Sequence, residues 1–308
     1  MAILSGLVSN MKGSAGSLTF RRSSGRTIVS EKITTVKVTR TELQQRHRTK
    51  WANIVQMWKG LSNELREAFS RKLAGRSDYN MFVQVNMQRL PVYLTKQQVT
   101  GGACVAAPYQ LTQGSLPAIV VTGSGQSAST DIALGSDGIS ASTTVAQFSR
   151  SVVTNNTDYQ YGDQITYFLV KQLVNADTAI PYCQFFSCKV VLDTEDDRKL
   201  WDVVMRNGFS SQDGCLGHSG NDGDCVYAWV HSRKTNGMVK VSPQTFVNAN
   251  TLLSEYTGDL AYNLAASSYG TTHDVYLSPN GGSGSDATPS GGGGGGDNPG
   301  GGGGNDSL

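Results

Sequence analysis

The chain has 308 residues, of which 26 are Lys or Arg and 24 are Asp or Glu, so its net charge is only +2. This length is enough for one or two substantial cores. The longest apolar runs are far shorter than the roughly 20 residues of a spanning helix, so we expect no membrane insertion. Five cysteines at irregular positions do not predict a disulfide framework, and they favour an intracellular origin.

Charge is distributed unevenly along the chain. Residues 1–98 hold 17 of the 26 basic residues but only five of the 24 acidic ones, a net charge of +12, whereas the remainder carries −10. This break predicts a basic domain over residues 1–98 and an acidic domain over residues 99–280. The basic domain is expected to face an anionic partner. Residues 281–308 are half glycine, 14 of 28, and are predicted to be a disordered tail because they cannot bury enough apolar surface.

The first 40 residues are predicted to form a β-ribbon. Leu18 and Phe20 alternate with polar residues, and the segment Arg21–Arg26 supplies a turn. The same alternation returns at Val36 and Val38. Strands on both sides of a polar turn are typical of an antiparallel ribbon.

A helical hairpin is predicted next. Thr41 is an N-cap candidate, apolar residues follow at helical spacing, and Gly60 is expected to end the first helix. Ser62 is then expected to cap a second helix, which Gly75 closes. A third helical element is predicted from Ser77 to Met87.

The acidic domain is predicted to be rich in β-structure and β-sandwich-like, with two short helices over residues 194–206 and 250–256. Clusters of Gly, Asn, Asp and Ser separate its strand-like runs. These runs are Ala118–Val121, Thr143–Phe148, Gln164–Val170, Phe185–Leu192, Val226–Val230 and His273–Leu277. The predicted fold class of the whole chain is therefore α+β: a β-ribbon with a helical hairpin, a β-sandwich-like domain and a disordered Gly-rich tail.

One segment, Asp213–Cys225, holds residues suited to a metal site or a disulfide. Cys215, His218 and Cys225 are candidate zinc ligands, but the segment lacks a fourth ligand and the paired short spacings of zinc sites. Its acidic residues do not match the EF-hand pattern. A Cys215–Cys225 disulfide is the other alternative, and a plain turn is favoured. We find no nucleophile with a partner and no catalytic motif, so the sequence predicts neither an enzyme nor a cofactor.

Seven basic residues of the first domain are the candidate binding residues. They could contact phosphates through counterion release without reading bases, or dock on acidic protein subunits. They are Arg21, Arg22, Arg26, Arg40, Arg46, Arg48 and Lys50.

Four segments follow one another in a distinctive order: Gly6–Ser9 with glycines at 13 and 16, Arg40–Gln45, Tyr79–Phe82 and Gln113–Leu116. This order resembles a family of uncharacterised proteins encoded in Bacteroidota genomes and in their phages or mobile elements. In that family a glycine-rich β-start leads to an Arg-Thr-x-x-Gln helix, a helical hairpin and a C-terminal β-domain. The resemblance covers residues 3 to about 120. It carries no catalytic residue over, and it implies a virion-associated or assembly role.

We therefore expect a non-enzymatic bacteriophage virion or assembly protein, found in the virion and, during assembly, in the host cytoplasm. Its basic domain would dock on other virion or assembly subunits, and the chain would form a homo-oligomer. The alternative is a nucleic-acid-binding or packaging protein that uses the same basic segment.

Overall fold

The structure is a computed structural model that describes residues 2–4, 12–23, 26–32, 42–65, 67–70, 75–136 and 138–269. Contacts divide the chain into two compact units, Met1–Thr41 and Glu42–Leu308. This division differs from the predicted boundary at residue 98, because the helices before that residue share a hydrophobic cluster with strands after it. The predicted strands at 36–38 and 273–277, and the tail over 281–308, lie outside the described residues.

The N-terminal unit contains a four-stranded antiparallel sheet with the strand order β1-β4-β3-β2. Its strands are β1 (Ala2–Leu4), β2 (Gly13–Ala15), β3 (Leu18–Ser23) and β4 (Arg26–Glu31). The β-structure predicted for this segment is thus present. Pairing of β3 with β4 continues to Ser23 opposite Arg26, so Arg21 and Arg22 lie in a strand and not in the predicted turn.

Three helices open the second unit: α1 (Glu42–Leu61), α2 (Asp78–Asn86) and α3 (Lys96–Thr100). The helix predicted from Ser77 to Met87 is confirmed as α2, and Ser77 caps it, since its hydroxyl accepts a hydrogen bond from the Asn80 backbone N–H. None of the helices within the described ranges combines the length and apolar character that crossing a bilayer requires.

The second helix predicted between Ser62 and Gly75 is wrong over its described residues, which form turns and a bridge from Phe69 to Gln113. The Ser62 hydroxyl donates a hydrogen bond back to the Lys59 carbonyl, so it does not cap a new helix. Beyond it, the chain exchanges backbone hydrogen bonds with Gln113. These bonds replace the helical ones that the sequence pattern predicts.

A five-stranded antiparallel sheet forms the centre of the second unit. Its main path is β13-β12-β8-β9, and a further short strand, β15, also pairs with β12. The predicted strands over 164–170, 185–192 and 226–230 are confirmed within it. Its strands are β8 (Gln164–Val174), β9 (Pro181–Val191), β12 (Cys225–Thr235), β13 (Met238–Val241) and β15 (Val247–Asn248).

A second antiparallel sheet has the order β10-β11-β7-β6. Its strands are β6 (Val121–Ser124), β7 (Ser127–Ala133), β10 (Ser210–Gln212) and β11 (Cys215–Ser219). A separate short pair joins β5 (Gln110–Thr112) to β14 (Gln244–Thr245). Residues of both larger sheets share one hydrophobic cluster, so the predicted β-sandwich-like arrangement is present.

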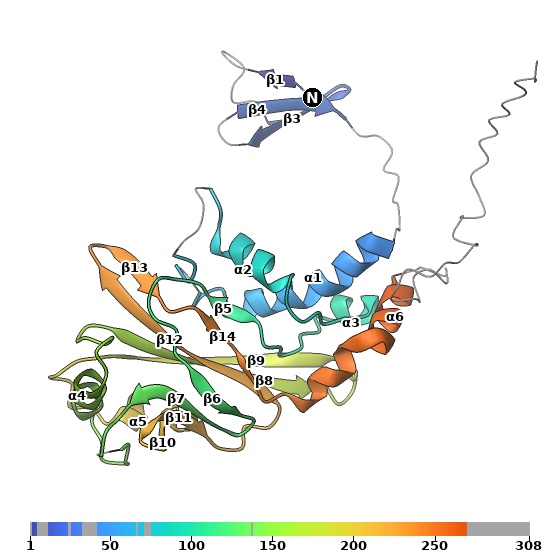
Figure 1. The fold of residues 1–308 in the computed structure, drawn as a ribbon. Coiled ribbons are helices and arrows are strands. Elements are labelled where there is room, and N and C mark those ends of the chain that lie inside the picture. The colour runs from blue at the N-terminus through green and yellow to red at the C-terminus, as the bar shows by residue number, and fades with distance from the viewer. Residues whose placement is uncertain are drawn as a thin grey trace, which may run out of the picture. The chain divides into compact units, whose positions relative to one another are not determined.

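The side chains of the central strands alternate between two hydrophobic clusters. In β8, Tyr167 and Leu169 belong to the cluster shared with the second sheet, whereas Phe168 and Val170 belong to a cluster shared with α1 and α2. Strand β12 alternates in the same way. The second unit therefore has three layers, with helices on one face of the five-stranded sheet and the four-stranded sheet on the other (Figure 1).

Other predicted elements in this unit differ in type or extent. Thr143–Phe148, predicted as a strand, contains the start of helix α4 (Val145–Asn155), because Thr144 and Gln147 form a capping box there. The run Ala118–Val121 reaches only the first residue of β6.

The two predicted short helices are present in reduced form. Residues 194–206 contain α5 (Leu200–Val203) and the first residue of a 3-10 turn, η1 (Arg206–Gly208). Residues 250–256 contain the 3-10 helix η2 (Thr251–Tyr256). A further helix, α6 (Gly258–Ser268), was not predicted.

Gly60 permits the close approach of α1 to the sheet. A Cβ at this position would collide with the Phe185 ring of β9. We expect Gly60→Ala to destabilise the second unit by about 1–3 kcal/mol through overpacking, even though alanine favours a helix interior over glycine by about 1 kcal/mol. Denaturant unfolding of the parent chain and of the Gly60→Ala variant would measure this loss of stability.

The neighbouring exposed residue provides the control: Lys59→Ala should change stability by at most about 0.5 kcal/mol. A Gly60→Ala variant at least as stable as the parent chain would contradict the packing argument.

Candidate functional site

The structure distributes the seven predicted binding residues between the two units. Arg21, Arg22 and Arg26 are exposed on β3 and β4 of the N-terminal unit. The other described ones lie on α1 of the second unit, and Arg40 lies outside the described residues. Those on α1 are Arg46, Arg48 and Lys50, of which Arg46 lies over the Tyr262 ring, 5.5 Å from its centroid.

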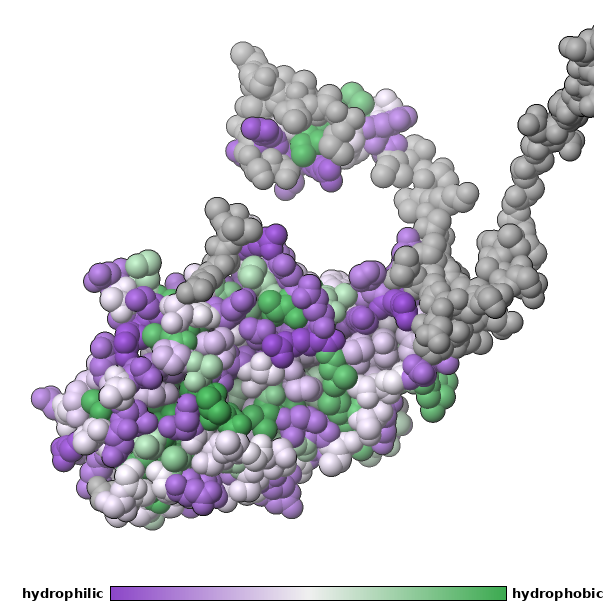
Figure 2. All heavy atoms as spheres, viewed as in Figure 1, coloured by the Kyte–Doolittle hydropathy of each residue, from purple (hydrophilic) through white to green (hydrophobic). Residues whose placement is uncertain are grey.

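The two faces of the N-terminal sheet differ in chemistry. Phe20 lies opposite Val29, and Leu18 lies on the same face. Arg22 and Glu31 also lie on this face, whereas the other face carries Arg21 and Arg26 on neighbouring strands together with Ile28. Leu18 is 43% exposed, and neither hydrophobic cluster of the second unit includes a residue of this sheet. Figure 2 shows hydrophilic residues beside hydrophobic ones on the visible part of this unit.

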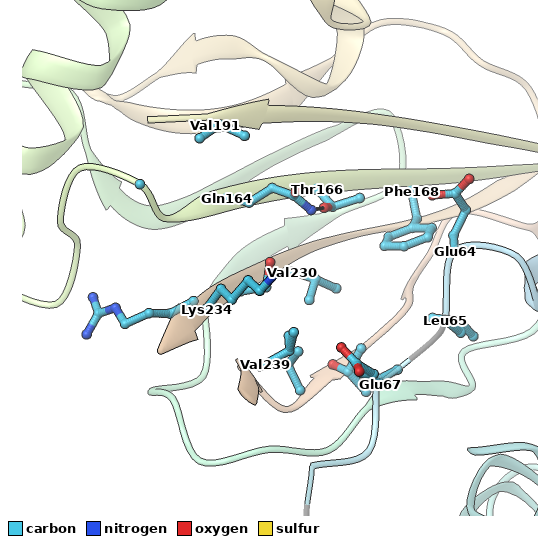
Figure 3. A pocket seen from close by; sticks show the side chains of 16 residues that line it. Glu64, Leu65, Glu67, Gln164, Thr166, Phe168, Val191, Val230, Lys234 and Val239 are labelled. Atoms are coloured by element: carbon cyan, nitrogen blue, oxygen red, sulfur yellow. Dashed lines mark hydrogen bonds between the residues drawn. The ribbon is translucent and has the colours of Figure 1, made fainter. Parts of the chain in front are cut away.

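A pocket of about 360 Å³ lies on the helix-side face of the five-stranded sheet, next to the chain that follows α1 (Figure 3). We call it the sheet-face pocket. Buried apolar side chains line part of it, among them Phe168, Val230 and Val241. Exposed Glu64 and Glu67 lie on one side, and exposed Lys234 lies on the other.

The position of Glu67 is fixed by an unusual backbone conformation. Its φ is +63°, a left-handed value that is uncommon outside glycine, and its N–H donates to the Asp78 carboxylate at 3.2 Å. The hydroxyls around the pocket belong to Thr112, Thr166 and Ser232, and none of them hydrogen-bonds to a histidine or a carboxylate in the described part of the chain.

A buried ionic network lies at the end of β8, beside this pocket. The Asp163 carboxylate accepts two hydrogen bonds from Arg233, at 2.7 and 2.6 Å, and one from His231 Nε2, at 2.9 Å. The Gln160 backbone N–H donates to the same carboxylate, and the Tyr159 ring stacks on His231 with centroids 4.3 Å apart. Asp163 and His231 are almost completely buried. The network thus holds the turn before β8 against β12.

Burial and hydrogen bonding set the charge states in this network. Burial of Asp163 opposes its ionisation, but the hydrogen bonds from Arg233, Gln160 and His231 outweigh that effect, so its pKa lies below the ordinary value. Burial lowers the pKa of His231, although the Asp163 carboxylate opposes that shift. A neutral His231 that donates to an ionised Asp163 accounts for the lowered pKa of each residue.

A second buried histidine lies between the two sheets. The Tyr167 hydroxyl is 2.8 Å from His218 Nδ1, and the Tyr227 ring stacks on the imidazole at 4.2 Å. Among the described residues His218 Nε2 has no hydrogen-bond partner, and Asp222 Oδ2 is 3.8 Å away. Lys171 and Asn207 bind the same carboxylate, at 2.8 and 2.9 Å. Tyr167 and His218 are fully buried, so this group packs in the interior between the two sheets.

The segment Asp213–Cys225 contains β11 and the connection to β12. Cys215 and Cys225 are both free, so the alternative of a disulfide between them is not realised in this structure. Within the described ranges, no group of three or more His, Cys, Asp or Glu side chains is arranged to hold a metal ion.

Sequence reasoning missed the Asp163 network. A signal was present, since Asp163 directly precedes a strongly apolar strand and His231 and Arg233 lie two residues apart on another strand. Their proximity depends on the pairing of β8 with β12, which places Gln164 opposite Ser232, and a single sequence does not give that register.

Comparisons of the chain with protein-family models, with curated proteins and with solved structures find no match. No relative therefore contributes a site residue.

Removal of the central carboxylate should destabilise the second unit. Asp163→Ala removes the carboxylate that accepts hydrogen bonds from the side chains of Arg233 and His231. We expect a loss of about 3 kcal/mol in the free energy of unfolding. The exposed Asp177→Ala variant, at the β8–β9 connection, serves as the control and should change stability by at most about 0.5 kcal/mol. Equal denaturation midpoints for the two variants would contradict a structural role for the network.

Stability should also decrease in mild acid. Burial lowers the pKa of His218 and His231 in the folded chain, so the unfolded chain binds protons first as the pH falls below about 6.5. The folded state then loses stability until the pH reaches the lowered pKa values of the two histidines. A further loss follows below about pH 4, because the pKa of Asp163 is lowered in the folded chain and its carboxylate is protonated first in the unfolded chain.

Urea midpoints measured from about pH 8 to about pH 5 would test whether stability decreases as the pH falls. The exposed His47→Ala variant should show the same decrease as the parent chain. A midpoint that stays constant or rises toward pH 5 would contradict the prediction.

Proposed function

We propose that this chain is a non-enzymatic structural or assembly protein of a bacteriophage virion, and that its N-terminal sheet docks on other subunits of the particle. The observation that supports docking most directly is the small size of this unit, Met1–Thr41, together with the apolar face of its sheet. The virion setting follows from the sequence resemblance described above.

A folded unit of about 40 residues usually needs a disulfide, a metal or association with another chain. Residues 1–41 contain no Cys and no His, so a disulfide within the unit and the usual zinc ligands are excluded. One face of the sheet carries Leu18, Phe20 and Val29, with Arg22 and Glu31 on the same face, and the apolar side chains of a sheet face are stabilised when another layer covers them. A neighbouring subunit is the covering layer that we propose.

Charge supports association between copies of the chain. Residues 1–41 hold seven Lys or Arg and a single acidic residue, Glu31, whereas residues 99–308 carry a net charge of −10. Opposite potentials on two parts of one chain favour head-to-tail contacts between copies. A homo-oligomer is therefore part of the proposal.

The alternative is a nucleic-acid-binding or packaging protein. The arginine face of the sheet favours it, because Arg21 and Arg26 are both exposed there; the exposed Arg22 lies on the Phe20 face. Two or more arginines on one face can neutralise phosphates without reading bases, and such binding weakens steeply with salt.

Light scattering of the full chain, at low and high salt and with a short DNA duplex, would distinguish these functions. We expect an oligomer that does not change with DNA and that persists at high salt through its apolar contacts, which salt does not screen, while the head-to-tail charge contacts weaken. A monomer that binds the duplex only at low salt would replace the assembly proposal with the nucleic-acid one.

A pair of variants would locate the docking face. Phe20→Asp places a charge on the apolar face and should shift the chain to monomers, since a buried unpaired charge is strongly unfavourable. Thr19→Asp, one residue away on the arginine face, should keep the oligomer. If both variants retain the same mass as the parent chain, the apolar face is not the docking surface.

A further inference from the structure

Two free cysteines from distant parts of the sequence meet at the edge of the five-stranded sheet. Cys104 lies between α3 and β5, and Cys183 lies on the edge strand β9. The Cys183 thiol donates to the Cys104 carbonyl oxygen, with Sγ and O 3.4 Å apart. The Cys104 backbone N–H donates to the Pro181 carbonyl at 2.9 Å.

These contacts fix the two residues side by side. The backbone bond anchors Cys104 two residues from Cys183 along β9, and both side chains belong to the cluster on the helix side of the sheet. A disulfide needs two residues whose backbones lie close together, and the two contacts of the Cys104 backbone with β9 meet that requirement.

The other cysteine of β9 shows that this pairing is specific. Cys188 packs against the cluster on the opposite side of the sheet, and its sulfur accepts a hydrogen bond from the Met205 backbone N–H at 3.3 Å. Cys215 and Cys225 lie on β11 and β12. Cys104 is the cysteine whose backbone N–H and carbonyl both bind β9 at or next to Cys183.

We infer that Cys104 and Cys183 are the site of a structural disulfide, which forms when the chain meets a small disulfide oxidant such as oxidised glutathione. This inference does not depend on the proposed function, since it concerns only the second unit.

The reaction balances as two thiol–disulfide exchanges. Cys183 is the more exposed of the two cysteines, so its thiolate attacks the oxidant, forms a mixed disulfide and releases one glutathione thiolate. The Cys104 thiolate then attacks Cys183 Sγ, the mixed disulfide breaks, and a second glutathione thiolate leaves. Both protein thiols are oxidised, one glutathione disulfide is reduced to two thiols, and these take up the two protons.

The local environment determines the rate of this reaction. Hydrogen bonding with Cys104 raises the pKa of the Cys183 thiol, and so does burial. Little Cys183 thiolate is therefore present at neutral pH. Oxidation should therefore be slow near neutrality and accelerate as the pH rises. The cross-link would close a loop between residues 79 positions apart, which reduces the conformational freedom of the unfolded chain.

The test uses the full reduced chain, exposed under native conditions to oxidised glutathione, then unfolded in denaturant, alkylated and weighed intact. We expect the loss of two hydrogens and two fewer alkylated thiols than the five of the reduced chain. Peptide mapping should join the peptides of Cys104 and Cys183. The oxidised chain should unfold at a higher denaturant concentration than the reduced one.

Variants separate this pair from the other cysteines. Cys188→Ser should still lose two thiols, whereas Cys104→Ser should stop at the mixed disulfide of Cys183 with glutathione. The inference is overturned if all five thiols of the parent chain remain open to alkylation after oxidation, or if the link maps to another pair. An oxidised chain that unfolds at a lower denaturant concentration would overturn its structural role.

Discussion

The burial of two strands on both faces is the constraint on which the second unit depends. Strands β8 and β12 pair over eight successive positions, and their side chains alternate between the helix-side cluster and the cluster shared with the second sheet. Each of these clusters needs the same two strands, so neither layer can form fully without the central sheet. The Asp163 network and the two facing cysteines both use positions that this sheet determines.

The sequence predicts such strands well and their surroundings less well. Gln164–Val170 and Val226–Val230 are found as strands because residues buried on both faces form continuous apolar runs. Ser62 and Thr144 show why short polar signals are less reliable. Both are residues that commonly cap helices, but the Ser62 hydroxyl turns back to Lys59, whereas Thr144 does begin a helix where β-branched residues predicted a strand. Long-range contacts decide between these outcomes.

The division of charge and the division of contacts along the chain do not coincide. Basic residues extend to residue 98, yet the contact boundary lies between residues 41 and 42. The helix α1 carries part of the basic charge on its exposed residues and uses its apolar residues, such as Ile54 and Met57, to cover the sheet. Charge is a property of surfaces and packing is a property of cores, so a boundary in one does not locate a boundary in the other. The candidate binding residues are accordingly divided between two units.

The division of the chain into two compact units has a consequence for how the molecule responds to heat. Cooperative unfolding requires elements that share a core, and the two clusters of the second unit include none from the first. In calorimetry the small sheet would therefore contribute its own weak transition, dependent on protein concentration if neighbours cover its apolar face. Amide protons of β3 and β4 would exchange with solvent when the small sheet unfolds, independently of the global unfolding of the larger unit.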